Sequence, residues 1–165
     1  MEYYFNFEKL EYVSSKKDDG CIFCGIVKRI EETKLLVTLT NRFIVILNLY
    51  PYNPGHTMII PKRHITDIRE LTVNENAEFN DLRDYCINMI EEIYKPHGFN
   101  IGFNMGLPAG ASITHLHLHI IPRYPNEIGI AELIGGKRVL VENPLDSCLK
   151  MKNWTENHPF STRKT

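Results

Sequence analysis

The sequence predicts an α+β domain with a mostly antiparallel five-stranded sheet and one long helix on one face. Three observations support this prediction. Five runs are rich in β-branched and aromatic residues, one long run between the third and fourth of them has helical periodicity, and turn-forming residues stand at the junctions. Strands grouped before and after a single helix are typical of α+β proteins rather than of alternating α/β proteins.

Composition sets the size and class of the protein. A chain of 165 residues with 43% hydrophobic and 24% charged residues suits one globular domain. The net charge of -1 gives no electrostatic reason to expect a nucleic-acid or membrane partner. The N-terminus lacks the features of a secretory signal, and no apolar run approaches about 18 residues. We therefore expect a single cytoplasmic domain over residues 1–165, with an N-terminal arm (1–20) and a C-terminal extension (126–165).

Three strands precede the helix. The runs KLLVTL (34–39) and FIVILNL (43–49) flank the short turn TNR and predict an antiparallel hairpin. After the turn YPYNPG, the run HTMIIP (56–61) predicts a third strand.

The helix begins at Thr72, which forms a capping-box pattern with Glu75. Apolar residues then recur at helical spacing until Pro96 and Gly98 end the helix. These apolar residues are Phe79, Leu82, Cys86, Met89, Ile90 and Ile93.

Two strands follow the helix, FNIGFNM (99–105) and HLHLHIIP (115–122), joined by GLPAGASIT. Side chains alternate across a strand, so the second run has an apolar face and a histidine face. The apolar face is expected to pack on the helix and consists of Leu116, Leu118 and Ile120. The opposite face consists of His115, His117 and His119.

A purely structural face would rarely use three histidines, because each buried imidazole has two nitrogens that need partners. Metal binding by the cluster and acid–base or nucleophilic catalysis by imidazole both suit this arrangement. The residues by themselves leave both possibilities open.

The four cysteines suggest a second chemical site. Cys21 and Cys24 form the close pair CIFC, whereas Cys86 lies in the helical pattern and Cys148 in a late loop. In a reducing compartment a C-x-x-C pair favours metal or redox chemistry over a structural disulfide. A zinc ion would need two further ligands to complete a tetrahedron.

The histidine run HLHLHIIP resembles the signature of the histidine triad (HIT) family of nucleotide hydrolases and transferases. NPGHTMIIPKRHI (53–65) also resembles a segment of that family, and together the similarity runs from about residue 21 to 123. The later GGKRVLVE is similar to a segment of bacterial diadenosine tetraphosphate phosphorylases in the same superfamily. The resemblance implies the HIT fold and, since family members pair their sheets, a homodimer.

The resemblance also implies a covalent mechanism. The middle histidine, His117, would attack the α-phosphorus of a nucleotide, with its other ring nitrogen bonded to a main-chain carbonyl of the same strand. His119 would bind the α-phosphate oxygens, and His56 would assist from the adjacent strand.

Substrate-binding residues follow from the same resemblance. Asn48 stands where one branch of the family has a ribose-binding asparagine, although an asparagine before Tyr-Pro is also a common turn former. Asn104 matches an amide residue near the scissile phosphate. The following loop would bring backbone amides to the phosphate and a serine hydroxyl beside the leaving group, or it is a plain strand connection. Its residues are Gly110, Ala111, Ser112 and Ile113.

In related HIT proteins a structural metal is completed by the histidine of the Pro-Lys-x-His segment and by the first histidine of the triad. These are His64 and His115 here, so the resemblance implies a structural zinc site formed with Cys21 and Cys24.

We therefore expect a hydrolase or phosphorylase that cleaves the α-phosphate bond of purine dinucleoside polyphosphates, such as diadenosine tetraphosphate, through a nucleotidyl-histidine. Three alternatives remain open. They are a hydrolase of nucleoside phosphoramidates or adenylylated amines, a nucleotide-binding regulatory protein with little turnover, and a metallohydrolase that uses the three histidines as its catalytic metal site.

Overall fold

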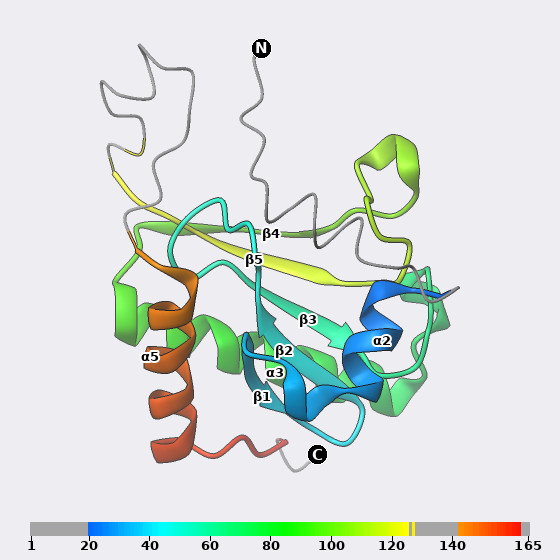
Figure 1. Ribbon diagram of the computed structural model, residues 1–165, viewed down its shortest axis with the longest axis horizontal. Helices are drawn as coiled ribbons and strands as arrows, with labels where there is room; N and C mark the ends of the chain where they lie inside the picture. The colour runs from blue at the N-terminus through cyan, green and yellow to red at the C-terminus, as the bar shows by residue number, and fades with distance from the viewer. Residues whose placement is uncertain (1–19, 126, 128–141, 163–165) are drawn as a thin grey trace.

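The computed structural model describes residues 20–125, 127 and 142–162. Within these residues five strands form one antiparallel sheet in the order β1-β2-β3-β5-β4 (Figure 1). The strands are β1 (Leu36–Leu39), β2 (Phe43–Leu47), β3 (Thr57–Pro61), β4 (Gly98–Phe103) and β5 (Leu118–Arg123). The α-helices are α2 (Ile22–Lys28), α3 (Val73–Tyr94) and α5 (Pro144–Asn157). Single 3-10 turns occupy Ile30–Glu32, Ile68–Glu70 and Leu107–Ala109.

The predicted sheet and long helix are confirmed. The hairpin of β1 and β2 and the third strand β3 lie where the runs at 34–61 placed them. The capping box of α3 is present, because the Thr72 hydroxyl accepts from the Glu75 amide and the Glu75 carboxylate accepts from the Thr72 amide. The helix ends at Tyr94, after which Lys95 adopts the left-handed conformation with φ 48°.

Two helices were not predicted. The seven-residue α2 begins directly after Cys21, and α5 occupies the C-terminal extension. The placement of Cys148 in a late loop was wrong, since it is buried in α5 with an exposed fraction of 2%.

Residues 1–19 of the expected N-terminal arm, and the segment GGKRVLV, lie outside the described residues. In the part of the chain that the structure describes, no helix is long and apolar enough to cross a membrane.

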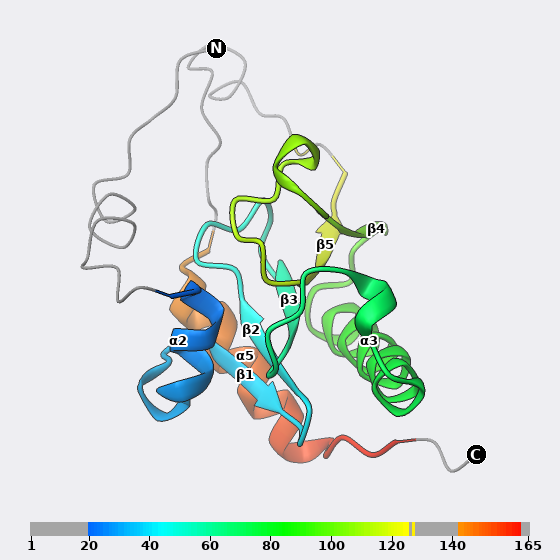
Figure 2. The same cartoon turned by 90° about the vertical axis from the view of Figure 1, so that its right-hand side faces the viewer.

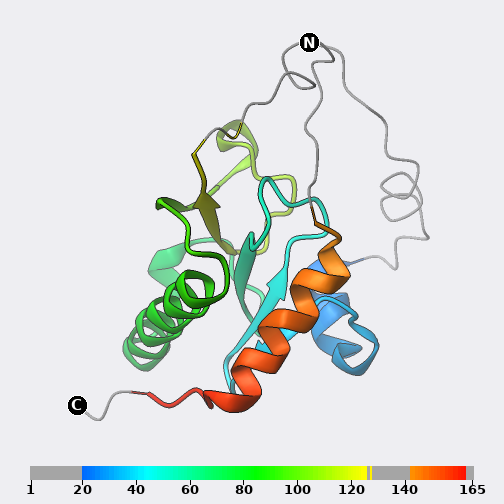
Figure 3. The same ribbon diagram turned by 90° about the vertical axis from the view of Figure 1, so that its left-hand side faces the viewer.

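The sheet separates two cores of different size. Alternate side chains of β2, such as Phe43 and Val45, join the larger core with α3 and α5, while Ile44 and Ile46 face α2. Figure 2 shows α2 and α3 on opposite sides of the sheet, and Figure 3 shows α5, in orange, in front of the first strands. The histidine-bearing side of β5 is therefore the side that α2 covers in part.

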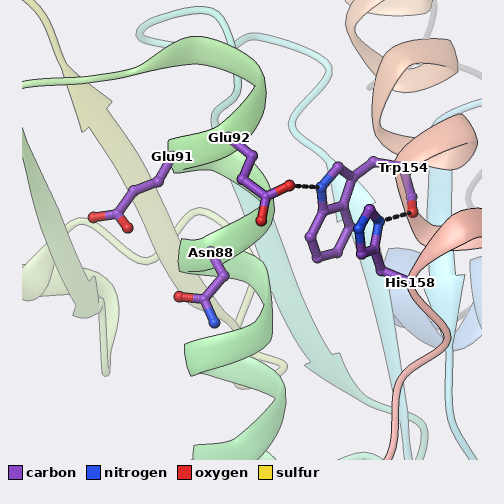
Figure 4. Close-up of a pocket in the computed structure, with 5 residues that line it drawn as sticks. All are labelled: Asn88, Glu91, Glu92, Trp154 and His158. Carbon is purple, nitrogen blue, oxygen red and sulfur yellow. Dashed lines mark hydrogen bonds between the residues drawn. The ribbon is translucent and has the colours of Figure 1, made fainter.

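Trp154 joins the C-terminal end of α5 to α3 through a hydrogen bond. The Trp154 indole N–H donates to Glu92 Oε2 at 2.6 Å, and the His158 ring stacks on the indole with centroids 4.3 Å apart (Figure 4). The residues around this contact line a shallow hollow and are Asn88, Glu91, Glu92, Trp154 and His158. This contact holds α5 against the larger core.

If α5 belongs to the larger core, shortening a buried side chain on it should destabilise the whole domain. Met151 is fully buried, so Met151→Ala is expected to lower the free energy of unfolding by about 2–5 kcal/mol. Leu149 on the same helix is 58% exposed, and Leu149→Ala is expected to change it by about 0.5 kcal/mol or less. Urea unfolding followed by the fluorescence of Trp154, the single tryptophan, measures both. Equal effects of the two variants would contradict the packing of α5.

Candidate active site and metal centre

The first residues of the histidine run lie outside the sheet. The strand expected from residue 115 begins only at Leu118, because the Leu116 amide donates to the Ile65 carbonyl at 2.7 Å instead of to a neighbouring strand. This bond joins the run to the turn after β3, which carries His64. His115 and His117 therefore lie on an irregular segment outside the ladder, and His119 lies within it.

Four potential metal ligands meet at this point. The ligand atoms of Cys21, Cys24, His64 and His115 all lie within 4.8 Å of one another. The Nδ1 atom of His115 is 3.4 Å from Cys21 Sγ and 3.6 Å from Cys24 Sγ, and His64 Nδ1 is 3.3 Å from Cys24 Sγ. Sulfur and nitrogen ligands of one tetrahedral zinc ion lie about 3.6 Å apart. The donor set and these distances are compatible with zinc.

His115 is oriented by a main-chain carbonyl. Its Nε2–H donates to the Pro61 carbonyl at 2.8 Å, which leaves the Nδ1 lone pair facing the cysteines. The ring is fully buried, and desolvation by burial lowers its pKa, which favours the neutral form that can bind a metal. Both nitrogens of His115 are thus engaged away from His117 and His119. The three histidines of the run do not form one common metal site.

The proton of His117 lies on the other ring nitrogen, Nδ1. Its Nδ1–H donates to the His115 carbonyl at 2.8 Å, so the lone pair is on Nε2. The predicted main-chain hydrogen bond to this ring is confirmed. The ring lies edge-on to Phe23 of α2, with centroids 5.0 Å apart, and is 5% exposed. Desolvation by burial lowers the pKa of His117, which keeps Nε2 unprotonated and nucleophilic.

A chain of hydrogen bonds fixes the protons of the other two histidines. The Tyr52 amide donates to His56 Nδ1 at 3.1 Å, so the His56 proton lies on Nε2. That nitrogen is 3.0 Å from His119 Nδ1, which can only accept from it. The proton of neutral His119 consequently lies on Nε2, and its ring lies edge-on to that of His117 with centroids 4.7 Å apart. Burial and nearby histidines lower the pKa of His56 to about 3 and that of His119 to about 4.

The two predicted substrate-binding asparagines lie on either side of the histidines. The Asn48 side-chain oxygen accepts from the Tyr50 amide at 2.9 Å, as in a turn, and its Nδ2 lies 3.4 Å from His56 Nε2. Asn104 is exposed, and its Nδ2 contacts the Gly110 carbonyl at 3.4 Å. Asn48 therefore serves the turn and also lies beside the site, so its ribose role stays a prediction.

In the loop before the histidines, two of the backbone amides expected to bind phosphate already donate hydrogen bonds within the loop. The Gly110 and Ala111 amides donate to Leu107 and Gly106 carbonyls, and Gly110 has φ 86°, which favours glycine. These two amides are thus occupied within the loop. Ile113 packs on the α2 side of the sheet, while Ser112 is exposed. The predicted phosphate contact therefore depends on the amides beyond Ala111, and the role of the Ser112 hydroxyl beside the leaving group stays a prediction.

The sequence interpretation missed two residues that support the site. Tyr52 supplies the amide that fixes His56 and stacks its ring on that imidazole, with centroids 5.5 Å apart. Asn53 is buried, and its Nδ2 donates to the Pro122 carbonyl at 2.7 Å. Both belong to the turn YPYNPG, in which Asn53, three residues before His56, could have indicated a tightly bonded turn.

These proton positions can be observed directly. Long-range ¹H–¹⁵N spectra of histidine-labelled protein are expected to show His117 protonated at Nδ1, and His56 and His119 at Nε2. Between pH 7 and 5.5 both of the latter rings should stay neutral while free histidine in the same buffer becomes charged, since their pKa values of about 3 and 4 lie below 6.5. The unfolded chain then binds more protons, so these rings lower the free energy of unfolding as the pH falls below 6.5. A His117 proton on Nε2 would contradict this arrangement.

Comparisons with known proteins identify the family of the chain and agree with its fold. The HIT domain matches residues 29–126, more than half of the chain. An AP-4-A phosphorylase of Mycobacterium tuberculosis is 39% identical over 119 residues, which are 72% of this chain and 61% of that protein. The chain therefore spans less than two thirds of the length of this relative.

Two solved structures have the same fold. A Zn-bound histidine triad family protein from Mycobacterium smegmatis is similar with a TM-score of 0.68 at 23% identity, covering 84% of this chain and 95% of that one. A hypothetical histidine triad nucleotide-binding protein from Sulfolobus tokodaii has a TM-score of 0.67 at 28% identity, with 83% and 93% covered. Together with the matched domain, these similarities show that the chain belongs to the HIT family.

Proposed function

We propose that this protein is an enzyme that cleaves purine dinucleoside polyphosphates, such as diadenosine tetraphosphate, at the α-phosphorus. The observation that supports this most directly is the bond from His117 Nδ1–H to the His115 carbonyl, which leaves Nε2 as a buried nucleophile. The relative named AP-4-A phosphorylase supports this substrate class.

In the first step, the Nε2 lone pair of His117 attacks the α-phosphorus and forms an N–P bond. The bridging P–O bond breaks, and its electron pair leaves with the rest of the polyphosphate. His56 accounts for Nδ1 of His119, so its Nε2–H would donate to an α-phosphate oxygen as charge develops there. In the second step, the oxygen of water or of inorganic phosphate forms a bond to phosphorus, the N–P bond breaks and its electron pair returns to Nε2; an attacking water releases one proton to solvent.

The neutral state of His119 favours polyphosphates over amines as leaving groups. A nucleoside polyphosphate departs as a stable anion and needs no proton, whereas an amine leaves readily only when it is protonated. Because the pKa of His119 is lowered to about 4, this ring donates a hydrogen bond but carries no extra proton at neutral pH. Phosphoramidates are therefore the second candidate substrates.

Product analysis tests this function. With diadenosine tetraphosphate, the wild-type protein is expected to give ATP together with AMP when water is the acceptor, or with ADP when phosphate is. His117→Ala is expected to lose turnover by at least about 10³-fold while its affinity for the nucleotide stays within about tenfold, since it removes the attacking atom and few binding contacts. Turnover of the variant close to wild type would exclude His117 as nucleophile. A wild-type protein that binds the nucleotide and forms no acid-labile nucleotidyl adduct would favour the regulatory alternative.

We also propose that Cys21, Cys24, His64 and His115 hold a structural zinc ion, which would tie α2 to the segment that carries His117. When bound, the ion supplies a rigid four-coordinate link and no open position for a substrate. The residues of this chain retain the chemistry, because the His115 carbonyl, rather than its ring, orients His117.

Two variants two residues apart separate the metal role from the catalytic role. His115→Ala removes a ligand and is expected to lower zinc content and the melting temperature, since metal binding contributes to folding free energy. His117→Ala, also a buried histidine, is expected to keep zinc near one per chain. Atomic absorption and thermal unfolding measure both properties. Full zinc content in His115→Ala would exclude it as a ligand.

The expected homodimer stays a prediction. Among the described strands β4 is an edge strand, and its Ile101 side chain is 42% exposed. A second sheet could pair with this edge, which fits a dimer.

A further inference from the structure

β5 continues past His119 with two more residues on the histidine side. Leu118 and Ile120 lie in the larger core, so the alternate residues point to the opposite face. Those residues are His119, Ile121 and Arg123. Beside this end of the strand is a hollow of about 220 Å³, called here the distal hollow, which is lined by Tyr52, Asn53, Ile121 and Arg123. Since two strand residues span about 7 Å, it begins about that far beyond His119.

The distal hollow is separate from the predicted ribose position. In the sheet order β2-β3-β5, Asn48 follows β2, whereas Ile121 and Arg123 belong to β5. His56, just before β3, lies between them. The turn that carries Tyr52 bends toward β5, because Asn53 Nδ2 donates to the Pro122 carbonyl there. A nucleotide bound at Asn48 would leave the distal hollow open.

One wall of the distal hollow is a flat aromatic ring. The Tyr52 residue is 57% exposed, and its ring lies within 20° of parallel to the His56 imidazole. The ring is therefore held beside the histidines that would contact phosphate. Nucleobases stack on exposed aromatic rings with little dependence on which base it is.

The rim carries an oriented guanidinium group. Arg123 donates from Nε and Nη2 to the Glu127 carboxylate, at 2.8 and 2.6 Å, and from Nη1 to Asn100 Oδ1 at 2.6 Å. Three of its five N–H groups are thus engaged by described residues, and two remain for phosphate oxygens. The Arg123 side chain is 48% exposed, so a ligand can reach these groups.

We propose that the distal hollow binds the leaving nucleoside phosphate, with its base stacked on Tyr52 and its phosphates at Arg123. This inference rests on the proposed function, because only a dinucleoside substrate carries a second nucleoside beyond the bond that breaks. The lining combines the aliphatic Ile121, the aromatic Tyr52 and the guanidinium of Arg123, which suit the base and the phosphates of one such group.

Two substrates with the same adenylate group and different leaving groups test this assignment. In adenosine 5′-phosphorimidazolide the leaving imidazole is too small to reach the distal hollow. Tyr52→Ala is expected to lower the kcat/KM for diadenosine tetraphosphate, relative to that for the imidazolide, about tenfold or more. Tyr52→Phe keeps the ring, and Leu49→Ala shortens a 36%-exposed side chain that directly precedes this turn and does not line the hollow. Both should keep this ratio within about twofold of wild type.

An unchanged ratio of the two kcat/KM values in Tyr52→Ala would overturn the distal subsite while the proposed function stands. If both values fall equally, the ring acts only through His56. If the wild-type protein cleaves neither substrate, calorimetry in the His117→Ala background measures binding in place of turnover. There, adding Tyr52→Ala should weaken diadenosine tetraphosphate about tenfold relative to AMP. If it does, the subsite holds although the proposed function fails, and an unchanged affinity ratio overturns the subsite.

Discussion

A neutral imidazole has one proton for two nitrogens, and in this fold main-chain groups decide where that proton lies. The Pro61 carbonyl fixes it on Nε2 of His115, and the His115 carbonyl fixes it on Nδ1 of His117. The Tyr52 amide fixes it on Nε2 of His56 and, through that ring, of His119. Neighbouring histidines of one short run therefore carry their lone pairs on different ring nitrogens, that of His115 on Nδ1 toward the cysteines and that of His117 on Nε2. Residue type alone could not produce this division.

Much of the fold and part of the site could be predicted from the sequence, because those features depend on local patterns. Strand alternation, the capping box at Thr72 and the turn YPYNPG are all contained within a few residues. The seven-residue α2 has no side-chain cap, so little in its own sequence marks its start. By contrast, Asn143 and Pro144 are a readable start for α5, since the asparagine side chain accepts from the Leu145 amide.

The departure of the histidine run from the sheet could not be predicted in the same way. It depends on the bond between the Leu116 amide and the Ile65 carbonyl, which joins segments far apart in the chain. A local pattern predicts only that His115 shares a face with His117. Similarly, the stacking of Tyr52 on His56 and the buried bond from Asn53 to β5 depend on how a turn folds over a distant strand.

The sheet order also determines when the site can form during folding. β1, β2 and β3 pair with their neighbours in sequence, and β4 pairs with β5, so each half can assemble from nearby segments. Within the described sheet, the two halves are joined only by the pairing of β3 with β5. His56 and His119 are 63 residues apart across that seam, and Cys21 and His115 are 94 apart. Contacts of such separation have a high loop-closure entropy and form slowly. We expect a newly made chain to hold neither metal nor nucleotide until the halves dock, with its cysteine pair exposed to oxidants throughout that interval.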